Sequence, residues 1–339
     1  MAPIKRQRKK SSYSLSSCIK FIVPLFIGIM IGMCYNNLTT ENELKIVTSS
    51  TGINSDNKSG WHPINVYFGK PEALKLNKPP MQSQGNANDG SQVKQDQIIM
   101  KLYKAYSDTV RTSTVFNESE RQPYFVDLAA NDASALSNTY NLEKNGWNGL
   151  CVEPNPVYWF RLAHRKCIVA GAFVGGKADM TEVDVVLQNK EFGGITGDGF
   201  DNNGTNEGLV KEKRLTVSIK SMFQQFNVPT TINYLSLDVE GAEELIMNEF
   251  PFDLYTIQFM TIERPKIGLQ ELLKKKNYRF VGLLVSWGES LWVHESVFQI
   301  LSLEVVNEIV SKTKVAQRKI KKGQNFFDIK SGTLLTHHI

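Results

Sequence analysis

Short apolar runs alternate with amphipathic stretches over the last two thirds of the chain. Runs of four to eight apolar residues bounded by turn residues are typical of buried strands, and apolar positions three or four apart are typical of helices. The predicted strands are 124–130, 149–154, 167–174, 182–187, 232–237, 257–264, 279–287 and 290–296, and the predicted helices are 134–145, 219–226, 243–250 and 268–277.

This alternation predicts an α/β domain with a mostly parallel, doubly wound sheet. We expect the domain to span residues 97–300, with a hairpin joining 167–174 to 182–187. The stretch 301–339 is expected to form an amphipathic helix and a basic tail.

A single strongly apolar stretch lies near the N-terminus. Residues 18–35 are interrupted only by Lys20, and we interpret them as a transmembrane signal anchor behind a cytosolic basic tail, 1–17. A cleaved signal peptide is the alternative, but no clear cleavage site follows. Residues 36–96 are polar and rich in turn residues, which predicts a flexible stem.

The charge distribution agrees with an anchored protein. Six of the 39 basic residues precede residue 21, and the remaining 33 are balanced by 34 acidic residues. Such a chain has no basic domain for nucleic acid, and the N-terminal charges favour a lumenal C-terminus in the endoplasmic reticulum or Golgi. Four glycosylation sequons fit that location: Asn37, Asn57, Asn117 and Asn203.

Common catalytic signatures are missing from the sequence. It contains no CxxC, HExxH or GxSxG motif, which disfavours a zinc ribbon, a zincin and an α/β-hydrolase. A GxxxxGK string at 171–177 is followed by Ala178, which lacks the hydroxyl that a P-loop needs. Cys151 and Cys167 lie in successive predicted strands, so they either form a disulfide or remain as two buried thiols.

Acidic residues recur where the predicted strands end. They are Asp127, Glu153, Asp238, Glu240 and Glu263. Ligands of open parallel sheets bind beyond the carboxyl ends of the strands, so these acids predict one shared site.

Two of these acids suggest a nucleoside ligand. Glu153 lies 26 residues after Asp127, a spacing typical of the acid that accepts ribose hydroxyls in nucleoside-binding folds. The alternative for Glu153 is a cap before Pro154. Asp127 could bind an ammonium group of the ligand, directly or through water.

The alternate acids of Asp238-Val-Glu240-Gly241 share one face of a strand end. A carboxylate there could take a proton from an acceptor hydroxyl, although Glu240 could instead cap the following helix. Either acid could also bind a divalent cation, but no histidine or third ligand lies nearby in sequence, so no metal site is predicted. Glu263 is a candidate for the acceptor pocket or a strand-end cap.

Several segments together resemble the FkbM-type methyltransferases. These are FVDLAANDASALSNTYNLEKNGWNGLCVEPNP, TVSIKSMF, INYLSLDVEGAEELIMNEFPFD and TIERP. The resemblance implies a class I methyltransferase fold, Rossmann-like, with seven strands of which the last is antiparallel. It also implies S-adenosylmethionine as cofactor, bound by Asp127, Ala129, Asn131, Asp132 and Glu153, with Asp238 and Glu240 as catalytic residues.

The first loop departs from the pattern of that family. Ala129 and Ala133 stand where the family usually has glycine. An alanine at positive φ costs about 1 kcal/mol, and its methyl group would approach the cofactor. The alternative is a loop with φ below zero at both residues.

Three functions are therefore compatible with the sequence. The first is an O-methyltransferase acting on a hydroxyl of a glycan or similar acceptor in the secretory lumen. The second is a non-catalytic cargo-export or trafficking factor, because the layout also resembles the insect Star protein. The third is a lumenal glycosyltransferase that uses the Asp238-Val-Glu240 acids.

Overall fold

The computed structural model describes the backbone of residues 66–68 and residues 90–113, 122–179, 181–188, 193–197, 200, 208–315 and 319–337. The proposed anchor 18–35 and the four sequons lie outside these residues. None of the described helices combines the length and apolar composition that a bilayer crossing requires.

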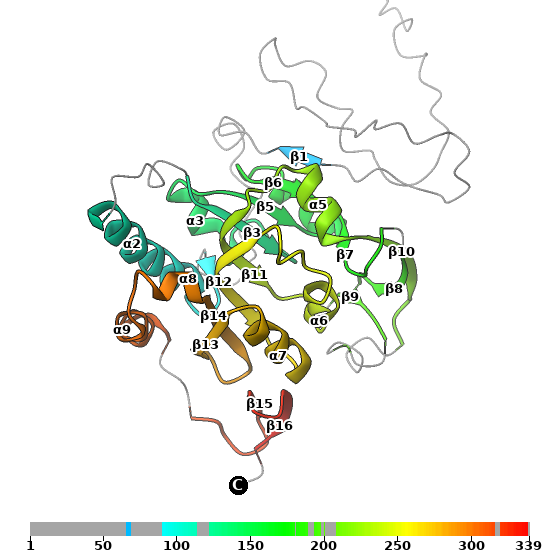
Figure 1. Ribbon diagram of the computed structural model, residues 1–339. Coiled ribbons are helices and arrows are strands. Elements are labelled where there is room, and N and C mark those ends of the chain that lie inside the picture. The colour runs from blue at the N-terminus through cyan, green and yellow to red at the C-terminus, as the bar shows by residue number, and fades with distance from the viewer. Residues whose placement is uncertain are drawn as a thin grey trace, which may run out of the picture. The chain divides into compact units, whose positions relative to one another are not determined.

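A central sheet of seven strands organises the domain (Figure 1). From one edge to the other, the strands are β6 (Ile168–Ala170), β5 (Asn148–Val152), β3 (Tyr124–Leu128), β11 (Thr231–Leu237), β12 (Thr256–Glu263), β14 (Glu289–His294) and β13 (Tyr278–Leu283). β14, the last of these along the chain, is antiparallel to both of its neighbours. This order is compatible with the predicted Rossmann-like fold, and it confirms that the last strand is antiparallel.

Two short strands precede the boundary expected near Gln97. β1 (Val66–Phe68) pairs antiparallel with β6 and adds an eighth strand at that edge. β2 (Gly90–Ser91) pairs with β4 (Ala135–Leu136). The described fold therefore includes two strands from the range 36–96.

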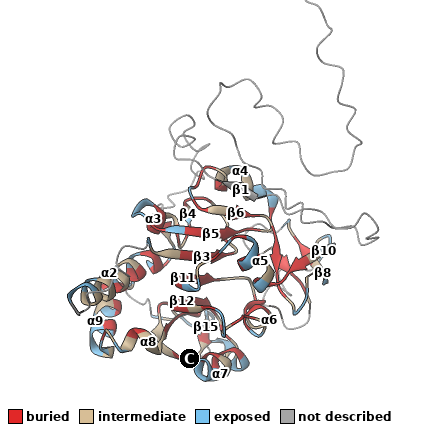
Figure 2. Ribbon diagram, turned by 45° about the horizontal axis from the view of Figure 1, so that its top comes forward, coloured by how far each residue is buried: buried red, intermediate tan, exposed pale blue. Residues whose placement is uncertain are grey.

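Helices cover both faces of the sheet because successive strand residues point to opposite sides. Val126, Leu235 and Met260 belong to one apolar cluster, with the helices α5 (Ile219–Gln225), α6 (Glu243–Met247) and α7 (Ile267–Lys275). Their neighbours Phe125, Tyr234 and Phe259 belong to the other cluster, with the helices α2 (Gln95–Ser113), α3 (Tyr140–Lys144), α4 (Trp159–Leu162), α8 (Glu295–Phe298) and α9 (Leu303–Thr313). Figure 2 shows the resulting buried layer of strands between the helices.

A second, smaller sheet corrects the predicted hairpin. β7 (Phe173–Val174) pairs in parallel with β10 (Glu212–Val217), whereas β8 (Glu182–Val186) pairs antiparallel with β10 and with β9 (Gly194–Ile195). The segment 167–174 is thus divided between two sheets, because the chain leaves β6 at Ala170 and enters the smaller sheet at β7. β8 therefore has β10, and not 167–174, as its neighbour.

Two further segments differ from the expected elements. The predicted helix 134–145 is reduced to α3, because Ala135 and Leu136 pair with β2 instead. Beyond α9, the expected basic tail contains a hairpin of β15 (Asn325–Asp328) and β16 (Thr333–Thr336). The backbone N–H of Phe327 donates to the carbonyl oxygen of Ser286 at 2.8 Å, which attaches this hairpin to the domain.

Candidate active site

One cavity of about 490 Å³ lies where the central strands end. Its lining includes residues at or after the ends of β3, β5, β11 and β12, among them Ala129, Glu153, Asp238 and Glu263. The smaller sheet and the β15–β16 hairpin contribute further walls, at Ile195 and Leu334. A cavity of this size at the carboxyl ends of parallel strands is the expected ligand site of such a fold.

Backbone strain is concentrated around this cavity. Of the eight non-glycine residues with positive φ in the described chain, five line it: Ala129, Asn131, Leu136, Glu240 and Arg264. Each left-handed non-glycine conformation is unfavourable, and such residues cluster at functional sites. The distribution of strain therefore supports the cavity as the functional site.

The two alanines of the first loop behave differently. Ala129 has φ of 62° and lines the cavity, so the alternative of φ below zero is wrong at this residue. Ala133 is not among the described residues with positive φ, and it is buried in the apolar cluster beneath α2 and α3. Only Ala129 therefore brings an additional methyl group to the cavity.

Glu153 directly follows β5 and is 4% exposed. One carboxylate oxygen accepts from the backbone N–H of Asn131 at 2.8 Å, and the other accepts from that of Asn155 at 2.7 Å. Burial raises the pKa of Glu153 to about 7, against the lowering effect of these two amides. The geometry is thus compatible with Glu153 as a cap and as an acceptor for ribose hydroxyls. A carboxylate has about four acceptor positions, and two of those of Glu153 remain for a ligand.

Asp127 lines the cavity but already has a side-chain partner. Its Oδ2 accepts a hydrogen bond of 2.6 Å from the hydroxyl of Thr139, and burial raises its pKa. Asp132 does not line the cavity. It accepts from the backbone N–H groups of Ser134 and Ala135 and forms an ion pair with Arg161, and its place in the cofactor site stays a prediction.

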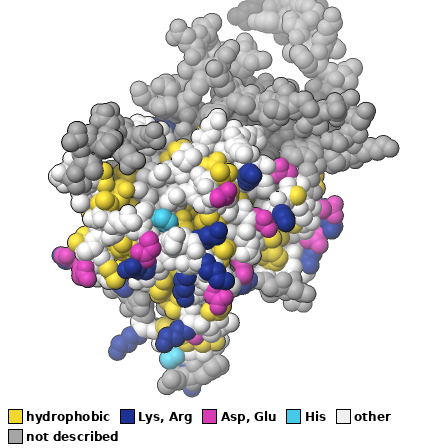
Figure 3. All heavy atoms as spheres, viewed as in Figure 1, with side chains coloured by type: hydrophobic (Ala, Val, Ile, Leu, Met, Phe, Trp, Pro, Cys, Tyr) yellow, Lys and Arg dark blue, Asp and Glu magenta, His cyan; other side chains and the backbone are white. Residues whose placement is uncertain are grey.

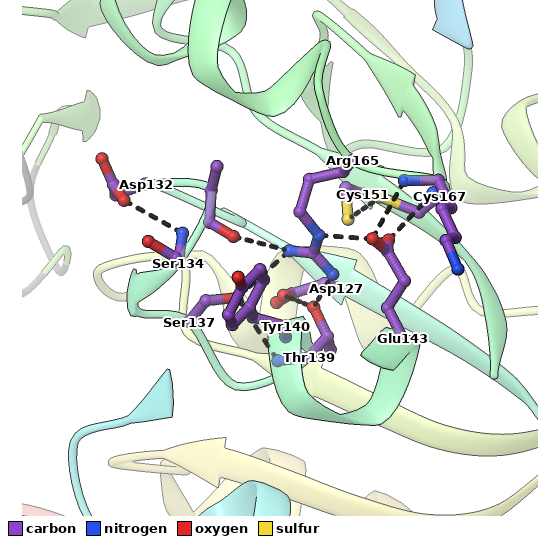
Figure 4. Close-up of polar contacts among 12 residues, drawn as sticks. Asp127, Asp132, Ser134, Ser137, Thr139, Tyr140, Glu143, Cys151, Arg165 and Cys167 are labelled. Atoms are coloured by element: carbon purple, nitrogen blue, oxygen red, sulfur yellow. Dashed lines mark hydrogen bonds and ion pairs between the residues drawn. The ribbon is translucent and has the colours of Figure 1, made fainter. Parts of the chain in front are cut away.

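A buried arginine missed by the sequence analysis organises the first loop (Figure 4). The guanidinium of Arg165 donates to the carbonyl oxygen of Ala133 and to the hydroxyls of Ser137 and Thr139, and it pairs with Glu143 at 3.1 Å. Thr139 in turn donates to Asp127. Arg165 therefore fixes the loop between β3 and α3. No local sequence motif indicates this role, because the partners of Arg165 lie 22 to 32 residues away along the chain.

The acids at the ends of β11 and β12 come together as predicted. One carboxylate oxygen from each of Asp238, Glu240 and Glu263 lies within 4.8 Å of the others. Arg264 pairs with Glu263 and, at 3.6 Å, with Glu240. Glu263 thus supplies a third carboxylate beside Asp238 and Glu240, although no third ligand lies near these two residues in the sequence.

Glu289 is a further acid in the cavity lining, and the sequence analysis missed it. It opens β14 opposite Glu263 in the strand register and is 4% exposed. Burial and the nearby Glu263 raise the pKa of Glu289 to about 8. Burial, followed by the charges of Glu263, Glu289 and Glu240, also raises the pKa of Asp238 well above its usual value.

Glu243 caps the turn after β11. Its Oε1 accepts from the backbone N–H groups of Val239 and Gly241, at 3.1 and 3.2 Å. Glu243 thus has at this turn the kind of role that was suggested for Glu240, three residues earlier. Glu240, with φ of 55°, instead lies in the cavity lining beside Arg264.

Comparison with known families assigns this domain. Residues 127–280 match the family model for the methyltransferase FkbM domain. The chain contains an FkbM methyltransferase domain. No curated protein matches the chain.

The matched range covers only part of the cavity lining. Asp127, Glu153, Asp238, Glu240 and Glu263 all lie within the FkbM match. Trp287, Glu289, Asn325 and Leu334 line the same cavity but follow the matched range. The FkbM domain is therefore completed by a segment that the family model does not describe.

Charges outside the FkbM cavity are mixed. On the face shown in Figure 3, acidic and basic side chains of the described residues are interspersed. Exposed ion pairs of the described residues include Lys104–Asp108 and Lys213–Asp184.

Cys151 and Cys167 are neighbours in the folded FkbM domain. Both are buried free thiols, with 2.7 Å between their sulfur atoms. We propose that they form a disulfide when the protein folds in an oxidising compartment. Mass spectrometry of unreduced peptides should then show residues 151 and 167 linked, whereas alkylation of both thiols without reductant would contradict the bond.

Proposed function

We propose that the FkbM domain transfers a methyl group from S-adenosylmethionine to a hydroxyl group of a glycan or similar acceptor. The observation that supports this most strongly is the continuity of one cavity. The cavity extends from the side proposed to bind the nucleoside, at Ala129 and Glu153, to the acids of the proposed acceptor side. These acids are Asp238, Glu240 and Glu263. A transferase needs these two sides in one enclosed space, because the methyl donor and the acceptor must meet in line.

The residues around Glu153 fit the cofactor. The backbone amides of Asn131 and Asn155 fix the Glu153 carboxylate, and its two remaining acceptor positions suit a pair of vicinal hydroxyls. Asp127 contributes by orienting the loop through Thr139 rather than by offering a free carboxylate. Ala129 also belongs to the cavity lining on this side.

Asp238 and Glu240 are proposed to assist proton loss from the acceptor. S-adenosylmethionine supplies a methyl group that is already activated by its sulfonium, so the protein must mainly position the acceptor and remove its proton. The carbon–sulfur bond would break as the methyl carbon bonds to the acceptor oxygen, S-adenosylhomocysteine would leave, and a carboxylate would take the hydroxyl proton. The raised pKa of Asp238 makes its ionised form a stronger proton acceptor.

Calorimetry of the full-length protein with S-adenosylhomocysteine tests the cofactor proposal. We expect saturable binding at one site per chain. If the wild-type protein gives no heat and no thermal shift, the non-catalytic alternative is favoured, and the positive φ of Ala129 is the observation behind it. In that case, binding by Ala129→Gly would identify the additional methyl group as the obstacle.

The lumenal location is proposed from the N-terminal charges and the sequons. We expect glycosidase treatment of the expressed protein to increase its gel mobility, because at least one of four sequons would be glycosylated in the lumen. A tag after residue 339 should resist protease in intact microsomes. Digestion of that tag would reverse the proposed orientation.

A further inference from the structure

We propose that Asp238, Glu240 and Glu263 form a binding site for one divalent, oxygen-preferring cation of the Mg²⁺, Mn²⁺ and Ca²⁺ class. The three carboxylates come from the ends of two neighbouring strands, β11 and β12, and all line the cavity. The site concerns these side chains alone and does not require that the domain be a methyltransferase.

The distances between the three carboxylates fit a shared cation. One oxygen from each residue lies within 4.8 Å of the other two. Oxygen ligands lie about 2.0–2.1 Å from Mg²⁺ and about 2.3–2.6 Å from Ca²⁺, so ligands on opposite sides of one ion are about 4–5 Å apart. A single ion can therefore contact all three carboxylates with small side-chain adjustments.

A separate observation at Asp238 also points to a missing partner. Its Oδ1 atom is enclosed, and it has no hydrogen-bond partner among the described residues. Enclosed polar atoms are nearly always paired, because leaving one unpaired forfeits its interaction with water. A cation between the carboxylates would supply the partner that this oxygen lacks.

The charge balance of the cavity favours an additional cation. Glu289 lies in the same lining, which brings four carboxyl groups together. Arg264 pairs with Glu263 and Glu240 and is the cationic side chain that lines the cavity in the described part of the chain. One guanidinium does not balance the three carboxylates of the proposed site, and a divalent ion would offset much of their mutual repulsion.

The turn after β11 directs Glu240 toward the site. Glu240 adopts a left-handed conformation with φ of 55°. Glu243 stabilises this turn by accepting from the backbone N–H groups on both sides of it, those of Val239 and Gly241. The cap thus maintains an unfavourable backbone conformation that places the Glu240 carboxylate near Asp238 and Glu263.

Three protein carboxylates would leave coordination positions for water or for another oxygen ligand. If the proposed methyl transfer is correct, an acceptor hydroxyl could occupy one of them and lose its proton more readily.

Calorimetry of EDTA-treated, full-length protein with MnCl₂ tests the site. We expect one Mn²⁺ per chain, and we expect Glu263→Gln and Glu240→Gln each to weaken binding at least tenfold. Glu271→Gln is the matched control, since Glu271 is an exposed glutamate of α7 outside the cavity lining. Thermal melting of each variant establishes that it is folded, and the second variant serves if the first does not fold.

Absence of Mn²⁺, Mg²⁺ and Ca²⁺ binding to the wild-type protein at millimolar concentration would overturn the proposal. Unchanged Mn²⁺ affinity in a folded Glu263→Gln or Glu240→Gln variant would also overturn it. S-adenosylhomocysteine binding is measured on the same samples. Cation binding without cofactor binding rejects the proposed methyl transfer and retains the cation site. Cofactor binding without cation binding rejects the cation site and retains the proposed methyl transfer.

Discussion

Replacing Asp238 with asparagine should lower the rate of methyl transfer by about 10²–10⁴-fold, the usual contribution of a general base. The asparagine keeps the shape of the side chain but cannot take the acceptor proton. S-adenosylhomocysteine affinity should change only a few-fold, because the cofactor contacts are proposed at Glu153 and the first loop. Turnover of the variant is compared with that of Asp253→Asn, an exposed aspartate outside the cavity lining.

The same assignment predicts the pH dependence of the wild-type rate. The pKa of Asp238 is raised, first by burial and then by the neighbouring acids. A base acts only when it is ionised, so the rate should fall as pH decreases through this raised pKa. If the rate and the cofactor affinity of Asp238→Asn fall together, the acid is structural, and if neither falls, Glu263 becomes the next candidate base.

Replacing Glu153 with alanine should weaken S-adenosylhomocysteine binding tenfold or more. Loss of charge-assisted hydrogen bonds to the ribose hydroxyls corresponds to about 1.5–3 kcal/mol. Calorimetry measures the affinity, and Glu271→Ala serves as the control because Glu271 is exposed on α7. Unchanged affinity in a folded Glu153→Ala variant would exclude Glu153 from the cofactor site.

The pKa of about 7 for Glu153 gives this prediction a second measurement. An ionised carboxylate accepts hydrogen bonds from hydroxyls more strongly than a carboxylic acid does, so affinity should rise between pH 6 and pH 8. The free energy of unfolding of the protein without cofactor should instead fall as pH rises. Because the folded-state pKa lies above the unfolded value of 4.5, the contribution of Glu153 is present at low pH and is lost as pH rises toward 7.

Most strands of the sheet could be predicted because each has a local sequence pattern. Runs such as 232–237 and 257–264 place apolar residues on both faces, as buried parallel strands do. The strand-end acids followed from the same pattern, since parallel strands end at one edge. The FkbM match then confirmed the family resemblance over 127–280.

What the sequence did not predict depends on partners that are distant along the chain. Arginine is usually a surface residue, and Arg165 is buried here because Glu143 and Thr139 pair with it. No spacing in the sequence indicates these contacts. Glu289 was missed because it is the first residue of β14 and lies one position before the predicted strand 290–296. The β15–β16 hairpin has two strands of only four residues, so the basic residues before it dominated the pattern.

The buried position of Arg165 has a consequence for the thermodynamics of binding. Its hydrogen bonds to Ala133, Ser137 and Thr139 shape the first loop without any ligand. A loop that is ordered in advance loses little conformational entropy when a cofactor binds. Glycine at Ala129 and Ala133 would make the first loop more flexible, whereas the buried Arg165 side chain restricts it. The affinity of the site therefore depends on a side chain that does not line the cavity.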